Sequence, residues 1–280
     1  MMADARTAVD QPAWGAFAPR GFGRVLLAFK SLGLSRGAVK KRLAQWWSRL
    51  GLPVPVDIRY GGLKFRIHPY DNAVENKLLF GSAQRDAREL ARVRDALAKG
   101  GAFLDIGANI GYYALSAARD GADVVLAFEP NPIVCERLRF NVDANGFTET
   151  IRVLPVALGD RTASMTLTMT GRDMGGGRIA AGGTRGDRSV EVQVRPLFEV
   201  LAEAGVTRIA AMKIDVEGME DAVLFPFFEA GLRESWPRLI VIEHTSQDSW
   251  RRNILNWLKE SGYREIERNR SNAMLERIDA

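Results

Sequence analysis

One short run, Phe103–Gly111, constrains the fold of this chain more than any other part of its sequence. It begins with apolar residues typical of a buried strand and ends in a turn that contains glycine. We expect a helix to open at about Tyr112 and a second strand at Val124–Phe128. A turn that leads from a strand into a helix presents free backbone N–H groups and the positive end of the helix dipole. Such a turn can bind an anionic ligand group.

The acidic residue that follows the second strand, Glu129, defines the ligand class more closely. A carboxylate at this position can accept hydrogen bonds from the hydroxyl groups of a ribose. A dinucleotide-binding turn has the pattern G-x-G-x-x-G, with a bare second glycine beside the pyrophosphate. Asn109 stands where that glycine is needed, and Gly111 comes one residue too early. The spacing therefore favours S-adenosylmethionine over a dinucleotide, while a purely structural turn is the alternative.

The composition is typical of an enzyme domain in a reducing compartment. At 280 residues the chain can bury one substantial core with appendages. Its single cysteine, Cys135, excludes an internal disulfide, and we interpret it as a small buried side chain. No apolar stretch reaches membrane-spanning length, and the N-terminus lacks the layout of a secretory signal. We therefore predict a soluble, cytoplasmic protein.

Positive charge is concentrated near the N-terminus. The formal net charge of the chain is +5, and residues 11–56 contain eight basic residues and no acidic one. Trp46 and Trp47 lie within this segment among apolar neighbours. The segment could pack as a helix on the catalytic domain, or it could rest on an anionic membrane surface through residues 11–50. An acid-free segment with several arginines is also compatible with a transit peptide.

The sequence pattern divides the chain into a basic extension, residues 1–53, and a catalytic domain, residues 54–280, that begins with a hairpin. Short apolar strands then alternate with helices, which predicts an α/β fold with a mostly parallel sheet of seven strands. Two strands within residues 263–278 are expected to form an antiparallel pair at one edge. An insertion at 160–195 interrupts the alternation, and we interpret its glycine- and arginine-rich part, residues 171–188, as a loop over the site.

Polar side chains follow the apolar parts of the later strands. Lys213, Asp215 and Glu217 alternate with apolar residues, so they share one side of an extended chain. Three ionisable groups on one side of a buried strand must solvate a ligand or each other, so a structural ion pair is the alternative reading. Glu243 and His244 end the next strand at the matching position. Because the carboxyl ends of parallel strands meet at one edge, we expect these residues to surround a ligand.

This acidic edge suits the positive charge of a sulfonium. The spacing of the acids does not demand a metal ion, and we predict none. We expect Asp215 or His244 to accept the proton of an acceptor hydroxyl, and Glu217 and Glu243 to orient the substrate or the base. A histidine at a strand end can also serve only as a hydrogen-bonding group.

Four separated motifs resemble, in order and spacing, those of the FkbM-type S-adenosylmethionine-dependent methyltransferases. These motifs are Asp105–Gly111, Phe128–Asn131, Val156–Asp160 and Lys213–Gly218. The pair Glu243-His244 is similar to that family's acid after the next strand. The resemblance covers the chain from about residue 71 onward and implies a class I methyltransferase fold with a Rossmann-like sheet.

The resemblance also implies which residues hold the cofactor and what the enzyme does. Glu129 would bind the ribose, Ala157 would lie near the adenine, and the methionine part would lie in the first motif. Members of the family usually methylate hydroxyl oxygens of sugars, polyketides or related natural products. The residues implied to contact S-adenosylmethionine are Asp105, Gly107, Asn109, Gly111, Glu129 and Ala157.

One departure from the family concerns the acceptor. Where members commonly have a Thr-Leu-Asp run, this chain has Arg195-Pro196-Leu197, so no acceptor contact is implied there. We expect a small-molecule or glycan hydroxyl as acceptor and no nucleic acid, because the run Asp215–Gly218 is unlike the Asn/Asp-Pro-Pro-aromatic run of base-amino methyltransferases. Two other interpretations remain: a nicotinamide-dependent oxidoreductase on the same topology, and a non-catalytic membrane-surface protein with a vestigial cofactor site.

Overall fold

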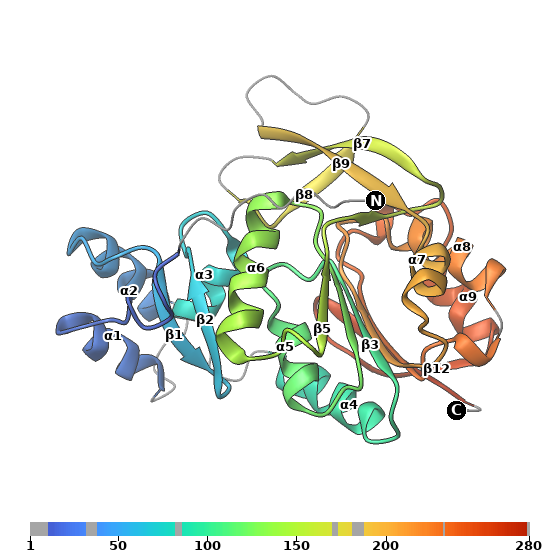
Figure 1. Cartoon of the computed structure of the whole chain (residues 1–280), viewed down its shortest axis with the longest axis horizontal. Coiled ribbons are helices and arrows are strands. Elements are labelled where there is room, and N and C mark those ends of the chain that lie inside the picture. The colour runs from blue at the N-terminus through green and yellow to red at the C-terminus, as the bar shows by residue number, and fades with distance from the viewer. Residues whose placement is uncertain are drawn as a thin grey trace.

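A sheet of seven strands runs through the centre of the molecule (Figure 1). The computed structural model describes residues 11–31, 38–81, 86–169, 173–180, 188–231 and 233–278. The strands of this sheet are β3 (Ala102–Ile106), β4 (Val125–Phe128), β5 (Ile151–Leu154), β10 (Ile209–Ile214), β11 (Leu239–Glu243), β12 (Tyr263–Arg268) and β13 (Asn272–Arg277). They lie in the order β12-β13-β11-β10-β3-β4-β5.

The direction of the strands confirms the predicted fold class. Strands β3, β4, β5, β10 and β11 pair in parallel, and β13 is antiparallel to both of its neighbours, β11 and β12. The sheet is therefore mostly parallel, with an antiparallel pair at one edge. Every residue of β3 and β10 is buried, as expected for parallel strands that are covered on both faces.

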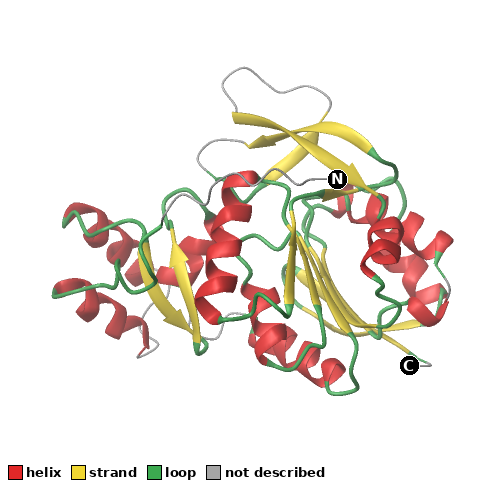
Figure 2. Ribbon diagram, in the orientation of Figure 1, coloured by secondary structure: helices red, strands yellow, loops and turns green. Residues whose placement is uncertain are grey.

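Helices cover both faces of this sheet (Figure 2). Successive side chains of each strand enter two separate cores, so Phe103 belongs to one core and its neighbour Leu104 to the other. The helices on the Phe103 side are α4 (Ala87–Leu97), α5 (Tyr112–Arg119) and α6 (Pro132–Asn145). Those on the Leu104 side are α7 (Leu197–Ala204), α8 (Glu220–Ala230) and α9 (Ile254–Glu260). Two short 3₁₀ helices are η1 (Arg233–Ser235) and η2 (Gln247–Ser249).

The N-terminal helices form one end of the molecule, at the left of Figure 1. They are α1 (Phe22–Ser31), α2 (Ala38–Arg49) and α3 (Ala73–Phe80), and the hairpin strands beside them are β1 (Val56–Tyr60) and β2 (Leu63–Ile67). Trp47 is fully buried, with its ring edge-on to that of Phe80 at 6.0 Å between centroids, whereas Trp46 is 46% exposed. One tryptophan of α2 therefore anchors the helix to the domain, and the other faces outward. Within the described ranges, no helix has the length and apolar character needed to cross a membrane.

The substitution Trp47→Ala is expected to lower the free energy of unfolding by about 3–5 kcal/mol, because truncating a buried tryptophan leaves a large cavity. Trp46→Ala, on the same helix, is the matched control and is expected to change that free energy by less than about 0.5 kcal/mol. Denaturant unfolding followed by circular dichroism measures both effects. Equal effects of the two substitutions would contradict the packing of α2 on the domain.

The insertion forms a second sheet of four strands, at the top of Figure 1. Its strands are β6 (Ala157–Leu158), β7 (Ala163–Met169), β8 (Gly177–Ala180) and β9 (Arg188–Arg195), in the order β6-β9-β7-β8. The prediction of a loop throughout residues 171–188 is wrong for β8, which pairs antiparallel with β7. The strand could not be recognised in the sequence, because its glycine-rich segment lacks an alternating pattern of side chains. Its pairing with β7 depends on backbone hydrogen bonds, which leave no such pattern. Residues 170–172 and 181–187 lie outside the described residues.

Candidate active site

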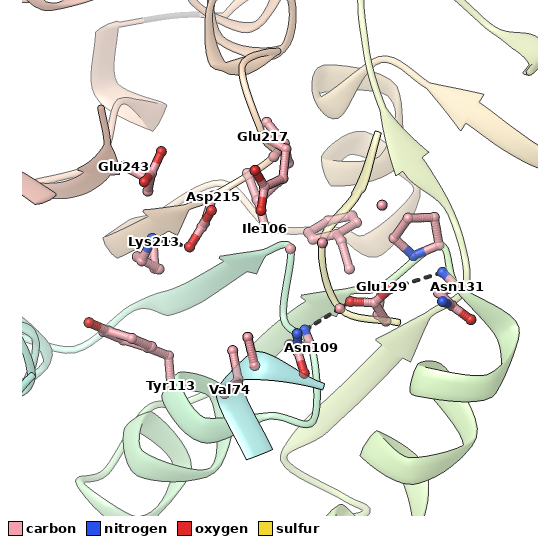
Figure 3. A pocket seen from close by; sticks show the side chains of 18 of the residues that line it. Val74, Ile106, Asn109, Tyr113, Glu129, Asn131, Lys213, Asp215, Glu217 and Glu243 are labelled. Carbon is pink, nitrogen blue, oxygen red and sulfur yellow. Dashed lines mark hydrogen bonds and ion pairs between the residues drawn. The ribbon is translucent and has the colours of Figure 1, made fainter. Parts of the chain in front are cut away.

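A cavity of about 500 Å³ opens at the carboxyl ends of the central strands (Figure 3). Residues that end or follow β3, β4, β10 and β11 line this central cavity, and the second sheet contributes Ala157, Leu158 and Leu167. Ligands of open parallel sheets bind at this edge, in the crevice outside the carboxyl ends of the strands. The volume of the cavity suits a small-molecule ligand.

Gly107 lets two strand ends meet beside the central cavity. Its φ of 79° lies in the left-handed region, and a Cβ atom on it would overlap the carbonyl oxygen of Asp215. The turn is held in place because the N–H groups of Gly107 and Ala108 both donate to the carbonyl oxygen of Phe128, at 3.1 and 2.9 Å. The N–H of Asp215 in turn donates to the carbonyl oxygen of Ile106 at 3.0 Å. The close approach of the backbone after β3 to the backbone after β10 therefore requires glycine at this position.

Asn109 occupies the place where a dinucleotide-binding turn would have glycine. Its Oδ1 accepts hydrogen bonds from the backbone N–H of Ile110 at 2.9 Å and from Nδ2 of Asn72 at 2.8 Å. Three non-glycine residues have a positive φ in the described part of the chain, namely Asp86, Asn109 and Glu217, and all three line the central cavity. Backbone strain of this kind is concentrated at functional sites.

Glu129 is buried at the wall of the central cavity. Its carboxylate accepts hydrogen bonds from the backbone N–H groups of Asn109 and Asn131, both at 2.9 Å (Figure 3). A carboxylate has about four lone-pair sites, so these two bonds leave acceptor capacity for a ligand. Burial raises the pKa of Glu129 to about 7, while the two N–H groups act in the opposite direction. The side chain is therefore a buried acceptor placed beside the turn that contains Gly107.

Two of the residues implied to contact the cofactor do not line the central cavity. Asp105 is buried and accepts a hydrogen bond from the backbone N–H of Ala114 at 2.8 Å, which ties β3 to the start of α5. Burial raises the pKa of Asp105 to about 7. Gly111 caps α5 with a φ of 89°, and a Cβ atom on it would overlap the side chain of Leu138. Asp105 and Gly111 therefore stabilise the turn without lining the cavity, whereas Gly107, Asn109, Glu129 and Ala157 line it. Their contact with the cofactor stays a prediction.

Lys213 and Asp215 form an ion pair, which the sequence analysis gave as the alternative to a functional role. Nζ of Lys213 lies 3.3 Å from Oδ2 of Asp215 and 5.8 Å from the ring centre of Tyr113. The lysine side chain is 5% exposed and that of the aspartate 42%, so the pair leads from the interior to the cavity surface. Both residues line the central cavity. The ion pair and a functional role of Asp215 are therefore compatible.

The structure brings Asp215, Glu217 and Glu243 together and leaves His244 outside the lining of the central cavity (Figure 3). The carboxylate of Glu243 accepts hydrogen bonds from the backbone N–H of Thr245, at 3.1 Å, and from its hydroxyl group. The ring nitrogen Nε2 of His244 lies 3.2 Å from the carbonyl oxygen of Asn269. Adjacent residues at a strand end face opposite sides, which explains why Glu243 reaches the cavity and His244 does not.

Residues that were not singled out in the sequence also line the central cavity. Asn72 caps α3 by accepting hydrogen bonds from the N–H groups of Val74 and Glu75, and it lines the cavity. A cap is readable in sequence, but the contact of Asn72 with Asn109 is not, because it depends on tertiary packing. The other lining residues of this kind include Ala73, Lys77, Tyr113, Thr245, Asn269, Ser271 and Asn272.

Residues 173–176, which precede β8, close one side of the central cavity. Met174 donates its N–H to the carbonyl oxygen of Asp71 at 2.7 Å and accepts a hydrogen bond from Nδ2 of Asn131 at 2.8 Å. A Cβ atom on Gly175 would overlap the side-chain amide of Asn109. Glycine at position 175 therefore allows this part of the insertion to pack directly against the turn that follows β3.

Cys135 has no catalytic surroundings. It is fully buried on α6, and burial raises the pKa of its thiol to about 11, as expected for a small core side chain.

Within the described residues, no group of three or more His, Cys, Asp or Glu side chains is arranged to hold a metal ion. The cytoplasmic location stays a prediction.

A family model described as the methyltransferase FkbM domain matches residues 105–265. Methyltransferase sdnD from Sordaria araneosa is 28% identical over 200 residues, which are 60% of this chain and 75% of that protein.

Two solved structures illustrate more remote similarity. Methyltransferase FkbM from Methylobacillus flagellatus KT is 14% identical, with a TM-score of 0.43 and coverage of 89% of this chain and 76% of that one. The ribosomal protein L11 methylase from Lactobacillus delbrueckii subsp. bulgaricus is 16% identical, with a TM-score of 0.42 and coverage of 71% and 80%. The FkbM family model alone spans more than half of the 280 residues, from β3 to β12. With its seven-stranded, mostly parallel sheet of the class I methyltransferase type, the chain belongs to the FkbM methyltransferase family.

Proposed function

We propose that this methyltransferase uses S-adenosylmethionine to methylate a hydroxyl oxygen of a sugar, a glycan or a polyketide-like small molecule. The observation that carries the proposal is the carboxylate of Glu129, which lies at the cavity wall with two backbone N–H groups already bound. Its remaining lone pairs suit the neighbouring hydroxyl groups of a ribose. Membership of the FkbM family supports the same methyl donor.

The other walls of the central cavity fit the remaining parts of this donor. Phe128, Ala157 and Leu158 offer apolar surface of the kind that suits a flat adenine ring. The turn containing Gly107 and Asn109 would hold the amino-acid portion. Carboxylates outnumber amines in the lining, which favours a cation such as a sulfonium. The ionisable residues of the lining are Asp86, Glu129, Asp173, Asp215, Glu217 and Glu243 on the acidic side and Lys77 and Lys213 on the basic side.

The donor, when bound, supplies a methyl group on a positively charged sulfur, so the chain does not have to activate a leaving group. Holding two reactants in line is worth about 7–11 kcal/mol of the barrier, while a general base adds about 10²–10⁴-fold in rate. We infer that Asp215 accepts the proton of the acceptor hydroxyl, because it lines the central cavity and His244 does not. Glu217 and Glu243 would orient the acceptor on the same side.

The acidic lining also restricts the acceptor. A phosphate or carboxylate group on the acceptor would approach Asp215, Glu217 and Glu243, and like charges repel strongly at a partly buried site. A nucleic acid is disfavoured for the same reason, since its backbone is anionic. A neutral compound rich in hydroxyl groups can instead donate hydrogen bonds to the same carboxylates.

Calorimetric titration of the purified chain with S-adenosylhomocysteine and, separately, with NADH tests the cofactor. We expect saturable binding of S-adenosylhomocysteine and none of NADH. Binding of NADH alone would favour an oxidoreductase on the same topology, and binding of neither would favour a non-catalytic protein. A screen of neutral sugars, polyketide-like alcohols and amino sugars with radiolabelled S-adenosylmethionine then tests the acceptor. Products methylated on nitrogen instead of oxygen would contradict the hydroxyl part of the proposal.

A further inference from the structure

Exposed apolar side chains are concentrated at the N-terminal end of the molecule. Eight large apolar side chains are exposed in the described part of the chain, and two of them, Ile133 and Ile278, lie elsewhere. The six at the N-terminal end are Phe22, Val25, Trp46, Leu50, Val54 and Tyr70. Monomeric proteins rarely keep a contiguous apolar patch in water unless it has a binding partner.

The two N-terminal helices divide their apolar side chains between an inner and an outer side. Gly23 of α1 lies against the ring of Trp47, and Leu26 and Leu43 are buried in the same core. The outer residues are spaced as helix neighbours, with Phe22 and Val25 three positions apart on α1 and Trp46 and Leu50 four positions apart at α2. The outer side therefore carries apolar side chains in addition to those that the fold already buries.

Basic residues flank these apolar residues along the sequence, and no acidic residue lies among those of α1 and α2. Arg20, Arg24, Arg42 and Arg49 are all exposed. Residues 11–56 contain no Asp or Glu. The next acidic residue, Asp57, is buried in an ion pair with Arg66 at 2.8 Å and does not neutralise this surface.

We propose that α1 and α2 bind the surface of an anionic phospholipid bilayer. Phe22, Val25, Trp46 and Leu50 would enter the region between headgroups and acyl chains, while the arginines contact the phosphates. Charge alone would also suit a nucleic acid, but a nucleic acid gives no apolar medium for these side chains. The projection of both helices from one end of the molecule leaves them accessible to a flat surface (Figure 1). This inference does not depend on the identity of the methyl donor or acceptor.

Flotation of the full chain with vesicles tests the proposal. We expect binding to vesicles that mix phosphatidylglycerol with phosphatidylcholine, weak binding to phosphatidylcholine alone, and loss of binding at high salt. The double substitution Trp46→Ala with Leu50→Ala is expected to lower the partition coefficient at least about tenfold, because two apolar side chains no longer enter the bilayer. Ile278→Ala, which truncates a side chain that is 68% exposed at the other end of the chain, is the control and should bind like the native protein.

A second set of variants tests the charge. Replacing Arg20, Arg24, Arg42 and Arg49 by glutamine is expected to weaken binding to anionic vesicles about fivefold per residue. The control replaces four exposed arginines elsewhere, at positions Arg88, Arg161, Arg251 and Arg264, and so removes the same charge. Absence of vesicle binding, equal losses in both sets, or tighter binding to an RNA oligonucleotide than to anionic vesicles would overturn the proposal. Unfolding temperature and S-adenosylhomocysteine affinity, measured on each variant, separate this result from a failure to fold or to bind the donor.

Discussion

The substitution Asp215→Asn is expected to lower the turnover number for methyl transfer about 10²–10⁴-fold, the usual contribution of a general base. The amide keeps the size of the side chain but cannot take up the proton of an acceptor hydroxyl. It also removes the carboxylate that pairs with Lys213 at 3.3 Å, so the fold of the variant is checked by its unfolding temperature. The rate is measured at saturating S-adenosylmethionine with the acceptor that the methyl-transfer screen identifies.

The matched control for this substitution is Asp95→Asn. The side chain of Asp95 is 62% exposed on α4 and does not line the central cavity, so its loss should leave turnover unchanged. Affinity of Asp215→Asn for S-adenosylhomocysteine should stay close to the native value, because the proposed role of Asp215 concerns the acceptor. Native turnover in Asp215→Asn would rule this residue out as the base. An equal loss of donor affinity would give it a binding role instead.

The substitution Gly107→Ala is expected to lower the free energy of unfolding by about 2–5 kcal/mol and to abolish donor binding in the fraction that folds. The φ of 79° disfavours any side chain, and the added methyl group would overlap the carbonyl oxygen of Asp215. Relief of that overlap must separate the ends of β3 and β10, which form the floor of the central cavity. Denaturant unfolding and calorimetric titration with S-adenosylhomocysteine measure the two effects.

The control Gly146→Ala separates the cost of the left-handed backbone from the cost of the steric overlap. Gly146 ends α6 with a φ of 73°, but a Cβ atom on it has open space around it. The free energy of unfolding of this control should therefore fall only by the cost of the left-handed backbone, about 1–2 kcal/mol, and the control should bind the donor normally. If Gly107→Ala were no more harmful than Gly146→Ala, the close approach of the two strand ends would not matter for the site.

Much of this architecture was predictable because local signals and topology agree. The apolar runs at β3, β4, β10 and β11 are long enough to be recognised, and parallel strands place their polar end residues at one edge. Gly107, Glu129, Asp215 and Glu243 were found in this way and do line the central cavity. The cap of α6 was also predictable, since Asn131 before Pro132 is a strong local signal.

The remainder depends on contacts between segments that are far apart in sequence. Alternation along a strand places Glu243 and His244 on opposite sides, but which side faces the central cavity depends on how β11 lies in the sheet, and the sequence does not fix that. Asn72 and Met174 meet the turn at Asn109 and the cap at Asn131 through long-range hydrogen bonds. Strand β8 has little side-chain pattern and exists through its pairing with β7.

Glu129→Gln gives the most direct measurement of the central claim, which is that this residue holds the ribose of the methyl donor. Loss of hydrogen bonds to a charged group is expected to raise the dissociation constant for S-adenosylhomocysteine about 10–100-fold, as measured by calorimetry. Glu136→Gln, at an exposed position of α6, is the control and should bind normally. A folded Glu129→Gln protein that binds S-adenosylhomocysteine as tightly as the native chain would contradict the account.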